Sequence, residues 1–342
     1  MKIMWYTNII EKGIIPDSLI RVKIRSLLKQ RLREERENYN LPELIKELKN
    51  SPIAIETKAA NDQHYELPAS FFESVLGKYL KYSCGYWDES IENLNQAEKR
   101  MLELSVERAE LRDGQDILEL GCGWGSLSIF MANKFPNSRI TVVSNSNSQR
   151  EFINSHALKS GITNLKVITA DMNDFTSDQL FDRVVSVEMF EHMRNYQELL
   201  YRIDNFLKPA GKLFVHIFSH TKLTYKFEVK DSSDWMSKYF FTGGIMPGEQ
   251  LFDHFQDHLS IEQRWHMNGV HYQKTAEAWL KRMDSNKNEI LSIFESTYGH
   301  SEAKKWWVYW RIFFMACAEL WGFKQGKEWS ISHYLFSKRN PN

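Results

Sequence analysis

Hydrophobic residues recur with a helical period in some segments of this chain and form short continuous runs in others. Residues 1 to about 50 are polar with a repeating apolar face, which predicts helices, and Ser51-Pro52 ends that pattern. A strongly periodic helix is expected over residues 96–111, and a shorter one over residues 69–79. Asp113-Gly114 marks the end of this helical part.

Apolar runs alternate with helical segments in the middle of the chain. They cover residues 116–120, 139–144, 164–169, 183–187 and 211–218. Strands and helices that alternate at this spacing indicate right-handed βαβ units. We therefore expect an α/β fold with a mostly parallel sheet.

Two long insertions interrupt the alternation after residue 218. Residues of about 220–258 show no strand–helix alternation, and residues 273–328 have a helical pattern rich in aromatic side chains. Strand patterns return at residues 259–262 and at residues 329–338, where the alternation has period two. Ligands bind beyond the carboxyl ends of the strands in such folds, so we expect the insertions to form a substrate lid.

These patterns divide the chain into two expected parts. Residues 1–100 are predicted to form an N-terminal helical cap with a loop that covers cofactor and substrate. Residues 101–342 are predicted to form the catalytic core, which carries both lid insertions.

Composition narrows the class of protein. Lys+Arg and Asp+Glu are equal at 44 each, which argues against a nucleic-acid partner. No apolar run approaches the roughly 18–20 residues of a membrane span, and the N-terminus lacks the pattern of a signal peptide. The 3 cysteines form no disulfide framework, so a reducing, cytoplasmic location is expected. A homodimer is possible, and the role of the first 50 residues is open.

Three alternate glycines follow the first apolar run. Gly121, Gly123 and Gly125 lie between that run and a helix-compatible segment. Glycine permits a positive φ and lets a cofactor approach the backbone closely. The Gly-x-Gly-x-Gly spacing lacks the third glycine of the dinucleotide fingerprint, and no Gly-Lys-Ser/Thr follows as in a phosphate loop. The turn therefore indicates a nucleotide-like cofactor of another kind.

An acidic and imidazole cluster follows the run at residues 183–187. Glu188, Glu191 and His192 lie within five positions, and on a helical turn they would share one face. A cofactor turn and an acid/base cluster at the ends of two strands of one sheet indicate an enzyme.

Taken together, the motifs resemble those of cyclopropane-fatty-acid-synthase-like class I methyltransferases, and within that group the coclaurine N-methyltransferase branch. The resemblance extends from about residue 62 to the C-terminus. It rests on six segments in order: Asp62-Gln63-His64-Tyr65-Glu66-Leu67-Pro68, Lys81-Tyr82-Ser83-Cys84, the glycine turn from Leu120 to Ser128, Glu188-Met189-Phe190-Glu191-His192-Met193, Tyr239-Phe240-Phe241-Thr242-Gly243-Gly244 and Trp279-Leu280-Lys281-Arg282-Met283-Asp284.

The resemblance implies a seven-stranded class I fold that binds S-adenosylmethionine. It places Tyr82, Ser83, Gly121 and Gly123 around the methionine part of this cofactor. Many class I enzymes hold the ribose with an acid after the second strand, but this chain has no acid there. The remaining contacts implied are amide substitutes for that acid at Asn145 and Gln149, and adenine contacts at Asp171 and Met172.

The resemblance also implies transfer of the methyl group to the nitrogen of a small aromatic amine, of benzylisoquinoline or tetrahydroisoquinoline type. A protonated amine cannot attack, so a base must remove its proton and an anion can hold the cation in place. We assign His192 as the general base, Glu191 as its orienting or amine-binding partner, and Glu188 as a second anionic group.

Two departures from the synthase pattern favour the N-methyltransferase branch. Glu188 stands where the synthases carry a glycine, and the short insert that follows the histidine in the synthases is absent here. An alternative is a cyclopropane-fatty-acyl-phospholipid synthase, since four residues match positions that hold bicarbonate in those enzymes: the catalytic candidate Glu191 and three residues assigned to the substrate pocket, Cys84, His216 and Tyr272. A third reading is an inactive relative that binds the cofactor and serves as an interaction module.

The histidines give no sign of a metal site. His216 and His220 are four residues apart, but they fall on a predicted strand end and no cysteine accompanies them. No metal is expected.

Overall fold

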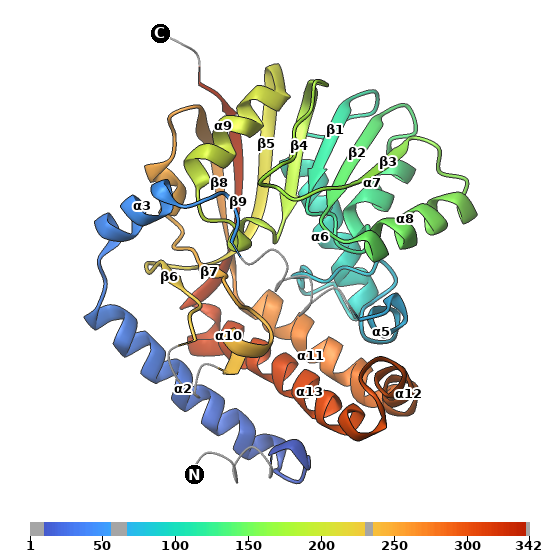
Figure 1. Cartoon of the computed structure of the whole chain (residues 1–342), viewed down its shortest axis with the longest axis vertical. Helices are drawn as coiled ribbons and strands as arrows, with labels where there is room; N and C mark the ends of the chain where they lie inside the picture. The colour runs from blue at the N-terminus through green and yellow to red at the C-terminus, as the bar shows by residue number, and fades with distance from the viewer. Residues whose placement is uncertain (1–9, 56–66, 230–234, 340–342) are drawn as a thin grey trace.

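A seven-stranded sheet organises the computed structural model, which describes residues 10–55, 67–229 and 235–339 (Figure 1). Its strands are β1 (Asp116–Leu120), β2 (Arg139–Ser144), β3 (Leu165–Thr169), β4 (Phe181–Val187), β5 (Leu207–His220), β8 (Leu259–Asn268) and β9 (Trp329–Lys338). They lie in the order β3-β2-β1-β4-β5-β9-β8, with β1 to β5 parallel and β9 antiparallel to both its neighbours. The expected α/β fold with a seven-stranded, mostly parallel sheet is confirmed.

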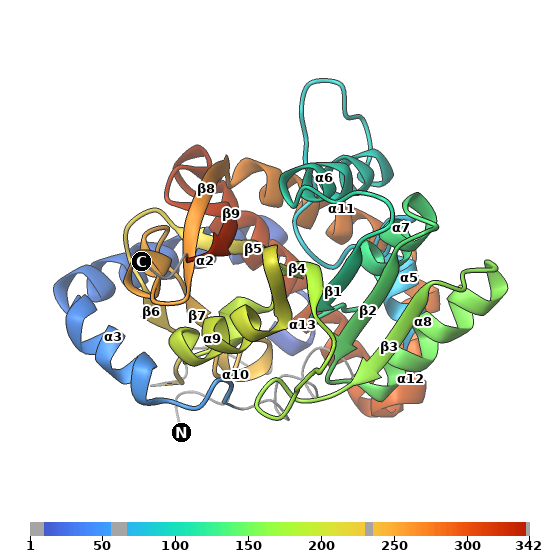
Figure 2. The same cartoon turned by 90° about the horizontal axis from the view of Figure 1, so that it is seen from above.

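Helices cover both faces of this sheet (Figure 2). One face packs against α6 (Leu94–Arg108), α7 (Ser126–Lys134) and α8 (Asn147–Lys159), and the other against α3 (Leu41–Asn50) and α9 (Tyr196–Phe206). Successive residues of β1 supply the two cores, because Ile117 packs with the first group of helices and Leu118 with the second. A strand that is buried on both faces has an unbroken apolar run rather than an alternating one.

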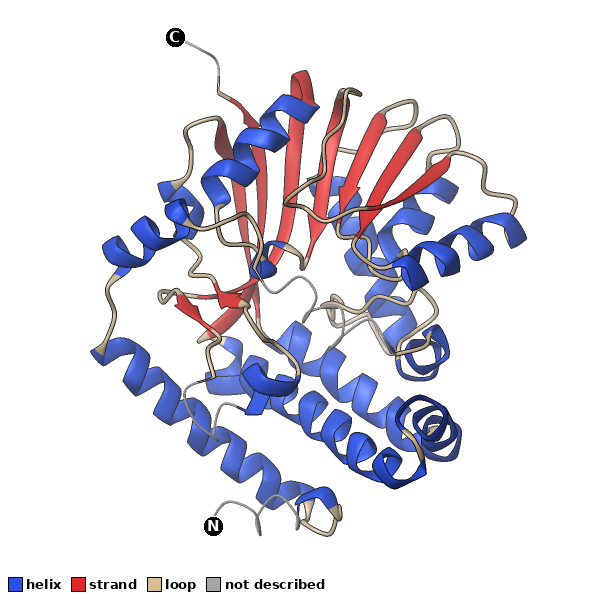
Figure 3. Ribbon diagram, viewed as in Figure 1, coloured by secondary structure: helices blue, strands red, loops and turns tan. Residues whose placement is uncertain are grey.

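A third layer of helices lies beyond the edge of the sheet at which β1 to β4 end (Figure 3). It contains α5 (Ala69–Val75), α10 (Trp235–Tyr239), α11 (Val270–Ser285), α12 (Lys287–Tyr298) and α13 (His300–Gly322). The two predicted insertions supply α10 to α13, together with the short strands β6 (Tyr225–Lys226) and β7 (Ile245–Met246). Three short 3₁₀ turns complete the described elements: η1 (Phe190–His192), η2 (Leu251–His254) and η3 (Phe323–Gly326). The lid role of the insertions stays a prediction.

The N-terminal helix α2 (Asp17–Glu37) is fastened to this third layer by ion pairs. Arg21 donates to Glu277 of α11 at 2.6 and 2.8 Å and to Glu319 of α13 at 3.0 Å. In the opposite sense, Arg311 of α13 donates to Asp17 at 2.8 and 3.0 Å. The apolar face of α2 packs into the same core through Ile20, Ile24, Leu28 and Leu32. These contacts place α2 on the outside of the helical layer.

The segment that precedes α6 departs from the expected pattern. The helix predicted over residues 69–79 ends at Val75, and the buried carboxylate of Glu98 accepts the backbone N–H groups of Gly77 and Tyr79 at 2.8 and 2.9 Å. This anchor turns the chain toward the sheet and directs residues 80–84 to the ends of the strands. Residues 62–66, the first part of the Asp62–Pro68 motif, lie outside the described residues.

Candidate active site

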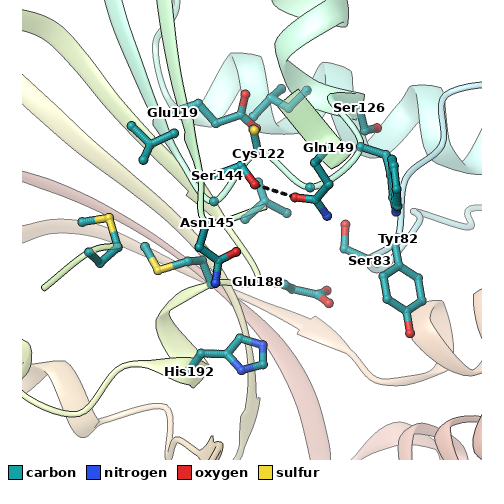
Figure 4. A pocket seen from close by; sticks show the side chains of 18 of the residues that line it. Tyr82, Ser83, Glu119, Cys122, Ser126, Ser144, Asn145, Gln149, Glu188 and His192 are labelled. Carbon is teal, nitrogen blue, oxygen red and sulfur yellow. Dashed lines mark hydrogen bonds between the residues drawn. The ribbon is translucent and has the colours of Figure 1, made fainter. Parts of the chain in front are cut away.

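A cavity lies where the carboxyl ends of β1 to β4 meet (Figure 4). The register of the parallel strands brings these ends together, since Leu120 of β1 is paired with Val143 of β2 and with Ser186 of β4. All eight residues that the motifs implied for the cofactor line this cavity: Tyr82, Ser83, Gly121, Gly123, Asn145, Gln149, Asp171 and Met172. The structure thus brings together residues from four separate segments of the chain.

The glycine turn forms the floor of the cavity and has the backbone conformation that its spacing indicated. Gly121, Gly123 and Gly125 have φ values of +80°, +51° and +83°, and Gly125 caps the N-terminus of α7. A Cβ atom added to Gly121 would lie 2.6 Å from Cγ of Met189. The turn therefore needs glycine at Gly121 for two reasons, the positive φ and the close approach of the next loop.

Replacing Gly121 by alanine should weaken cofactor binding roughly tenfold and lower the free energy of unfolding by about 1–3 kcal/mol. The cause is the strained φ combined with displacement of Met189, which also lines the cavity. Gly114→Ala is the matched control, because Gly114 has a φ of +86° but no atom within 4 Å of its added Cβ and does not line the cavity. Titration calorimetry with S-adenosylmethionine should show unchanged affinity for the control. Equal affinities for both variants would contradict the role of the turn.

Three buried polar groups around the cavity have no hydrogen-bond partner within the described parts of the chain. They are Nε1 of Trp124, Oγ of Ser126 and Nε2 of Gln149. The Gln149 side chain is oriented by Ser144, whose hydroxyl donates to Oε1 of Gln149 at 2.7 Å (Figure 4). Buried polar groups are normally satisfied, so these point to a polar ligand. Trp124 and Ser126 lie inside the quoted glycine motif, but the sequence does not predict that their side chains line the cavity.

Lys81 is a further cavity residue that the sequence analysis did not assign. Its side chain is 2% exposed, its ammonium group donates to the hydroxyl of Ser83, and burial lowers its pKa. Glu119 of β1 also lines the cavity, where burial raises the pKa of its carboxyl to about 8 although the Ser128 hydroxyl donates to it at 2.5 Å. The cofactor side of the cavity therefore contains a buried ammonium group close to a carboxyl that is protonated at neutral pH.

The side-chain carboxylate of Glu188 lies at the centre of the part of the site that faces away from the glycine turn. It follows β4 directly and has a φ of +48°, a left-handed conformation that is rare for a residue with a side chain. Its Oε1 accepts the backbone N–H of Cys84 at 3.0 Å and lies 3.1 Å from Nε2 of His216, and its Oε2 accepts the hydroxyl of Tyr272 at 2.6 Å. The three predicted substrate-pocket residues therefore converge on Glu188.

The structure separates the three members of the acidic cluster. Glu188 and His192 line the cavity, and the ring of His192 lies 4.8 Å from that of Phe241, centre to centre. Glu191 lies between them in η1, is 0% exposed and is not among the cavity residues. Neither of its carboxyl oxygens has a partner in residues 10–55, 67–229 and 235–339. Two of the three side chains thus meet at the cavity.

The environment raises the pKa of both carboxyl groups, but further at Glu191 than at Glu188. Burial raises the pKa of both, but Lys81, Tyr272 and the Cys84 N–H oppose this rise at Glu188. At Glu191 no donor from another residue opposes it, and the neighbouring charge of Glu188 raises the pKa further, well above its usual range. When two nearby carboxyls interact, the one with the more strongly raised pKa takes up the first proton, which favours ionisation of the other. We therefore take Glu188 as the carboxylate and Glu191 as the carboxylic acid.

The described residues contain no group of three or more His, Cys, Asp or Glu side chains placed to hold a metal ion. His216 bonds to Glu188, whereas His220 accepts the backbone N–H groups of Lys222 and Leu223, both at 2.9 Å. A search of the same residues finds no helix with the length and apolar character needed to cross a bilayer.

Comparison with known proteins was made on both sequence and structure. Residues 54–327 match the family model described as mycolic acid cyclopropane synthetase. The chain is 38% identical over 340 residues to (S)-coclaurine N-methyltransferase of Thalictrum flavum subsp. glaucum, covering 96% of this chain and 94% of that protein. It is 29% identical over 283 residues to the cyclopropane-fatty-acyl-phospholipid synthase of Escherichia coli (strain K12), covering 82% and 68%. A crystal structure of coclaurine N-methyltransferase bound to N-methylheliamine and SAH matches with a TM-score of 0.94 at 36% identity, covering 99% of this chain and 100% of that one.

Proposed function

The chain belongs to the mycolic acid cyclopropane synthetase family and is an S-adenosylmethionine-dependent methyltransferase, and from this we propose that it methylates the nitrogen of a small aromatic amine of benzylisoquinoline type. The family expected from the sequence motifs is thereby confirmed, as is the cofactor. The choice of acceptor and the roles of individual residues are our proposal. The similarity to N-methyltransferases over 96% of the chain supports the amine.

The cavity residues suit S-adenosylmethionine, which supplies an already activated methyl group on a sulfonium sulfur. The unpartnered Nε2 of Gln149 can donate to a ribose hydroxyl, and Asn145 lies beside it at the end of β2. Asp171 and Met172 follow β3 and line the cavity, and we assign them to the adenine. Ser83, Gly121 and Gly123 lie toward the methionine part, where the buried ammonium group of Lys81 can attract a carboxylate.

The observation that carries the proposal is the position of the Glu188 carboxylate. The resemblance implies that the synthases hold a bicarbonate ion with residues matching Cys84, Glu191, His216 and Tyr272, and that they carry a glycine at the position of Glu188. Here three of these four residues, Cys84, His216 and Tyr272, direct polar groups at Oε1 and Oε2 of Glu188. A carboxylate that belongs to the chain thus takes the contacts of the dissolved ion. This favours an acceptor that needs a fixed anion beside it, as an ammonium ion does, over bicarbonate-dependent lipid chemistry.

The proposed roles follow from this arrangement. Glu188 faces the cavity as an anion and can hold the protonated amine in register. His192, from the same cavity wall, removes the proton and so frees the nitrogen lone pair for in-line attack. Glu191 is neutral and buried behind them, where it keeps the potential near Glu188 less negative than a second anion would.

A methyl-transfer assay with labelled S-adenosylmethionine tests this proposal. It should be run in parallel on a tetrahydroisoquinoline amine and on vesicles of unsaturated phospholipid, each with and without added bicarbonate. We expect label on the amine at a rate that does not depend on bicarbonate, because Glu188 already occupies the three donors. Label in the acyl chains that increases with bicarbonate would overturn the proposal in favour of the lipid synthase.

A further inference from the structure

A chain of side-chain hydrogen bonds joins the Glu188 carboxylate to the end of α6. Nε2 of His216 lies 3.1 Å from Oε1 of Glu188, and Nδ1 of His216 lies 2.8 Å from Nε2 of His333. Nδ1 of His333 lies 2.9 Å from NH1 of Arg108. Glu188 follows β4, and the other three residues come from β5, β9 and α6, so neither the glycine turn nor the acidic cluster predicts these contacts.

The chemistry of arginine fixes the direction of every bond in this chain. A guanidinium group only donates, so Nδ1 of His333 must accept and carries no proton. The proton of neutral His333 is then on Nε2, from which it is donated to Nδ1 of His216. By the same argument His216 holds its proton on Nε2 and donates it to Glu188. One permanent donor at Arg108 thus sets two tautomers and delivers a third donor to the carboxylate.

Burial holds both imidazole rings in the neutral form that this argument requires. His216 and His333 are each 0% exposed, and their burial, together with the charges of Lys81 and Arg108, lowers the pKa of both well below its usual range. Phe214 packs edge-on against His333 at 5.0 Å between ring centres. A charged ring at either position would leave its proton aimed at another donor.

Arg108 is placed for this role rather than for an ion pair. Its guanidinium lies over the ring of Trp265 at 5.0 Å, and NH1 also lies 3.3 Å from the sulfur of Met267. Within the described residues no carboxylate oxygen lies within 4.0 Å of its nitrogens. The side chain of Arg108 is partly buried, and its guanidinium group contacts the buried ring of His333. Its hydrogen bond to an imidazole is therefore the polar contact that orients it.

We propose that Arg108, His333 and His216 are positioning residues that hold the Glu188 carboxylate in its ionised, substrate-facing state by keeping three hydrogen-bond donors on it. Without Arg108 the two histidines can reverse together, which turns a bare Nε2 of His216 toward Oε1. A lone pair facing a carboxylate is repulsive, so the reversed arrangement is stable only when Glu188 takes up a proton. Replacement of Arg108 should thus make Glu188 easier to protonate, although Arg108 itself contacts neither substrate nor cofactor.

Other groups also act on Glu188 and stay in place when Arg108 is changed. Those that face it from the elements packed around it are Lys81, Cys84, Glu191, His216, Tyr272 and Cys317. The backbone N–H of Cys84 and the hydroxyl of Tyr272 do not depend on Arg108. The expected effect is therefore partial: Glu188 is protonated more readily, but it is not neutral at all pH values.

The tautomers can be read directly by nuclear magnetic resonance of the enzyme labelled with ¹⁵N in its histidines. In the ligand-free wild-type protein, both buried histidines should give the signals of the neutral Nε2–H tautomer. Arg108→Met should produce a mixture of the two tautomers, and Arg108→Lys, which keeps a permanent donor, should restore the wild-type signals. Arg183→Met is the matched control, because Arg183 is also partly buried and bonds to the carbonyl oxygen of Ala109, next to Arg108.

Kinetics give a second readout, which rests on the proposed amine methylation. Arg108→Met should move the acidic limb of the kcat/KM profile for a tetrahydroisoquinoline amine up by about one pH unit, with the KM for S-adenosylmethionine unchanged. The proposal is overturned if wild-type His333 or His216 proves to be charged or in the Nδ1–H form. It is equally overturned if Arg108→Met leaves both the tautomers and the acidic limb unchanged. The spectra need no substrate, so they separate a failure of this inference from a failure of the proposed function.

Discussion

A Glu188→Gly variant should methylate a tetrahydroisoquinoline amine roughly a hundred- to a thousandfold more slowly than the wild type, and added bicarbonate or formate should restore part of the rate. The substitution removes the carboxylate but leaves the Cys84 N–H, His216 and Tyr272 in place around the space it occupied. A small anion can bind to these three donors and replace the missing charge. Steady-state kinetics with and without each anion, against chloride at equal ionic strength, measure the rescue.

The loss should not come from unfolding. Glu188 has a left-handed φ of +48° and a buried charge, and both features cost stability in the folded state. Glycine adopts that φ without strain, so the melting temperature should be unchanged or higher. Asp116→Asn is the control, because Asp116 is also a buried acidic residue but lies at the start of β1 and does not line the cavity. Wild-type turnover by Glu188→Gly, or a loss that no anion relieves, would contradict the assigned role of the carboxylate.

Replacing His192 by alanine should lower kcat roughly a hundredfold or more at neutral pH while leaving the affinity for S-adenosylmethionine unchanged. The imidazole faces the cavity and is proposed to take the proton of the bound amine. Without it, reaction depends on amine that is already deprotonated, a fraction that grows with pH toward the alkaline pKa typical of alkylamines. The rate of the variant should therefore increase steeply from neutral to alkaline pH, whereas that of the wild type should be nearly level.

The pH profile separates a missing base from a damaged cavity. A variant that has merely lost shape would be slower by a constant factor at every pH. His254→Ala serves as the control, since His254 is exposed in η2 and lies outside the cavity. If His192→Ala shows wild-type kinetics, or a uniform reduction with no dependence on pH, His192 is not the base.

The cofactor side of the site was accessible to sequence reasoning for a simple physical reason. The strands expected over residues 139–144 and 329–338 are β2 and β9 with the same bounds, because continuous apolar runs and period-two alternation are local signals. Parallel strands end at one edge of the sheet, so residues that follow such runs must lie near one another. This is why Gly121, Asn145 and Asp171, far apart along the chain, line one cavity.

The part of the site that we propose for the amine could be predicted only partly from the sequence. Shared helical spacing suggested that Glu188, Glu191 and His192 would converge, but the left-handed φ at Glu188 and the 3₁₀ turn that follows direct Glu191 away from the cavity. Arg108 and His333 act across 225 residues of sequence, and no local pattern marks such a contact. Lys81 lay within a quoted motif, but no local pattern indicates that its ammonium group is buried.

The position of β9 has a consequence for how the enzyme becomes active as it folds. This strand comes last among the seven in sequence, yet it lies between β5 and β8, so β8 joins the sheet only through it. The strands that carry the cofactor residues pair through short βαβ connections, whereas β9 must find β5 across more than a hundred residues. His333 arrives with β9. We therefore expect affinity for the cofactor to form before His333 completes the contacts of the Glu188 carboxylate, so that catalytic competence depends on the long-range pairing of β9 with β5.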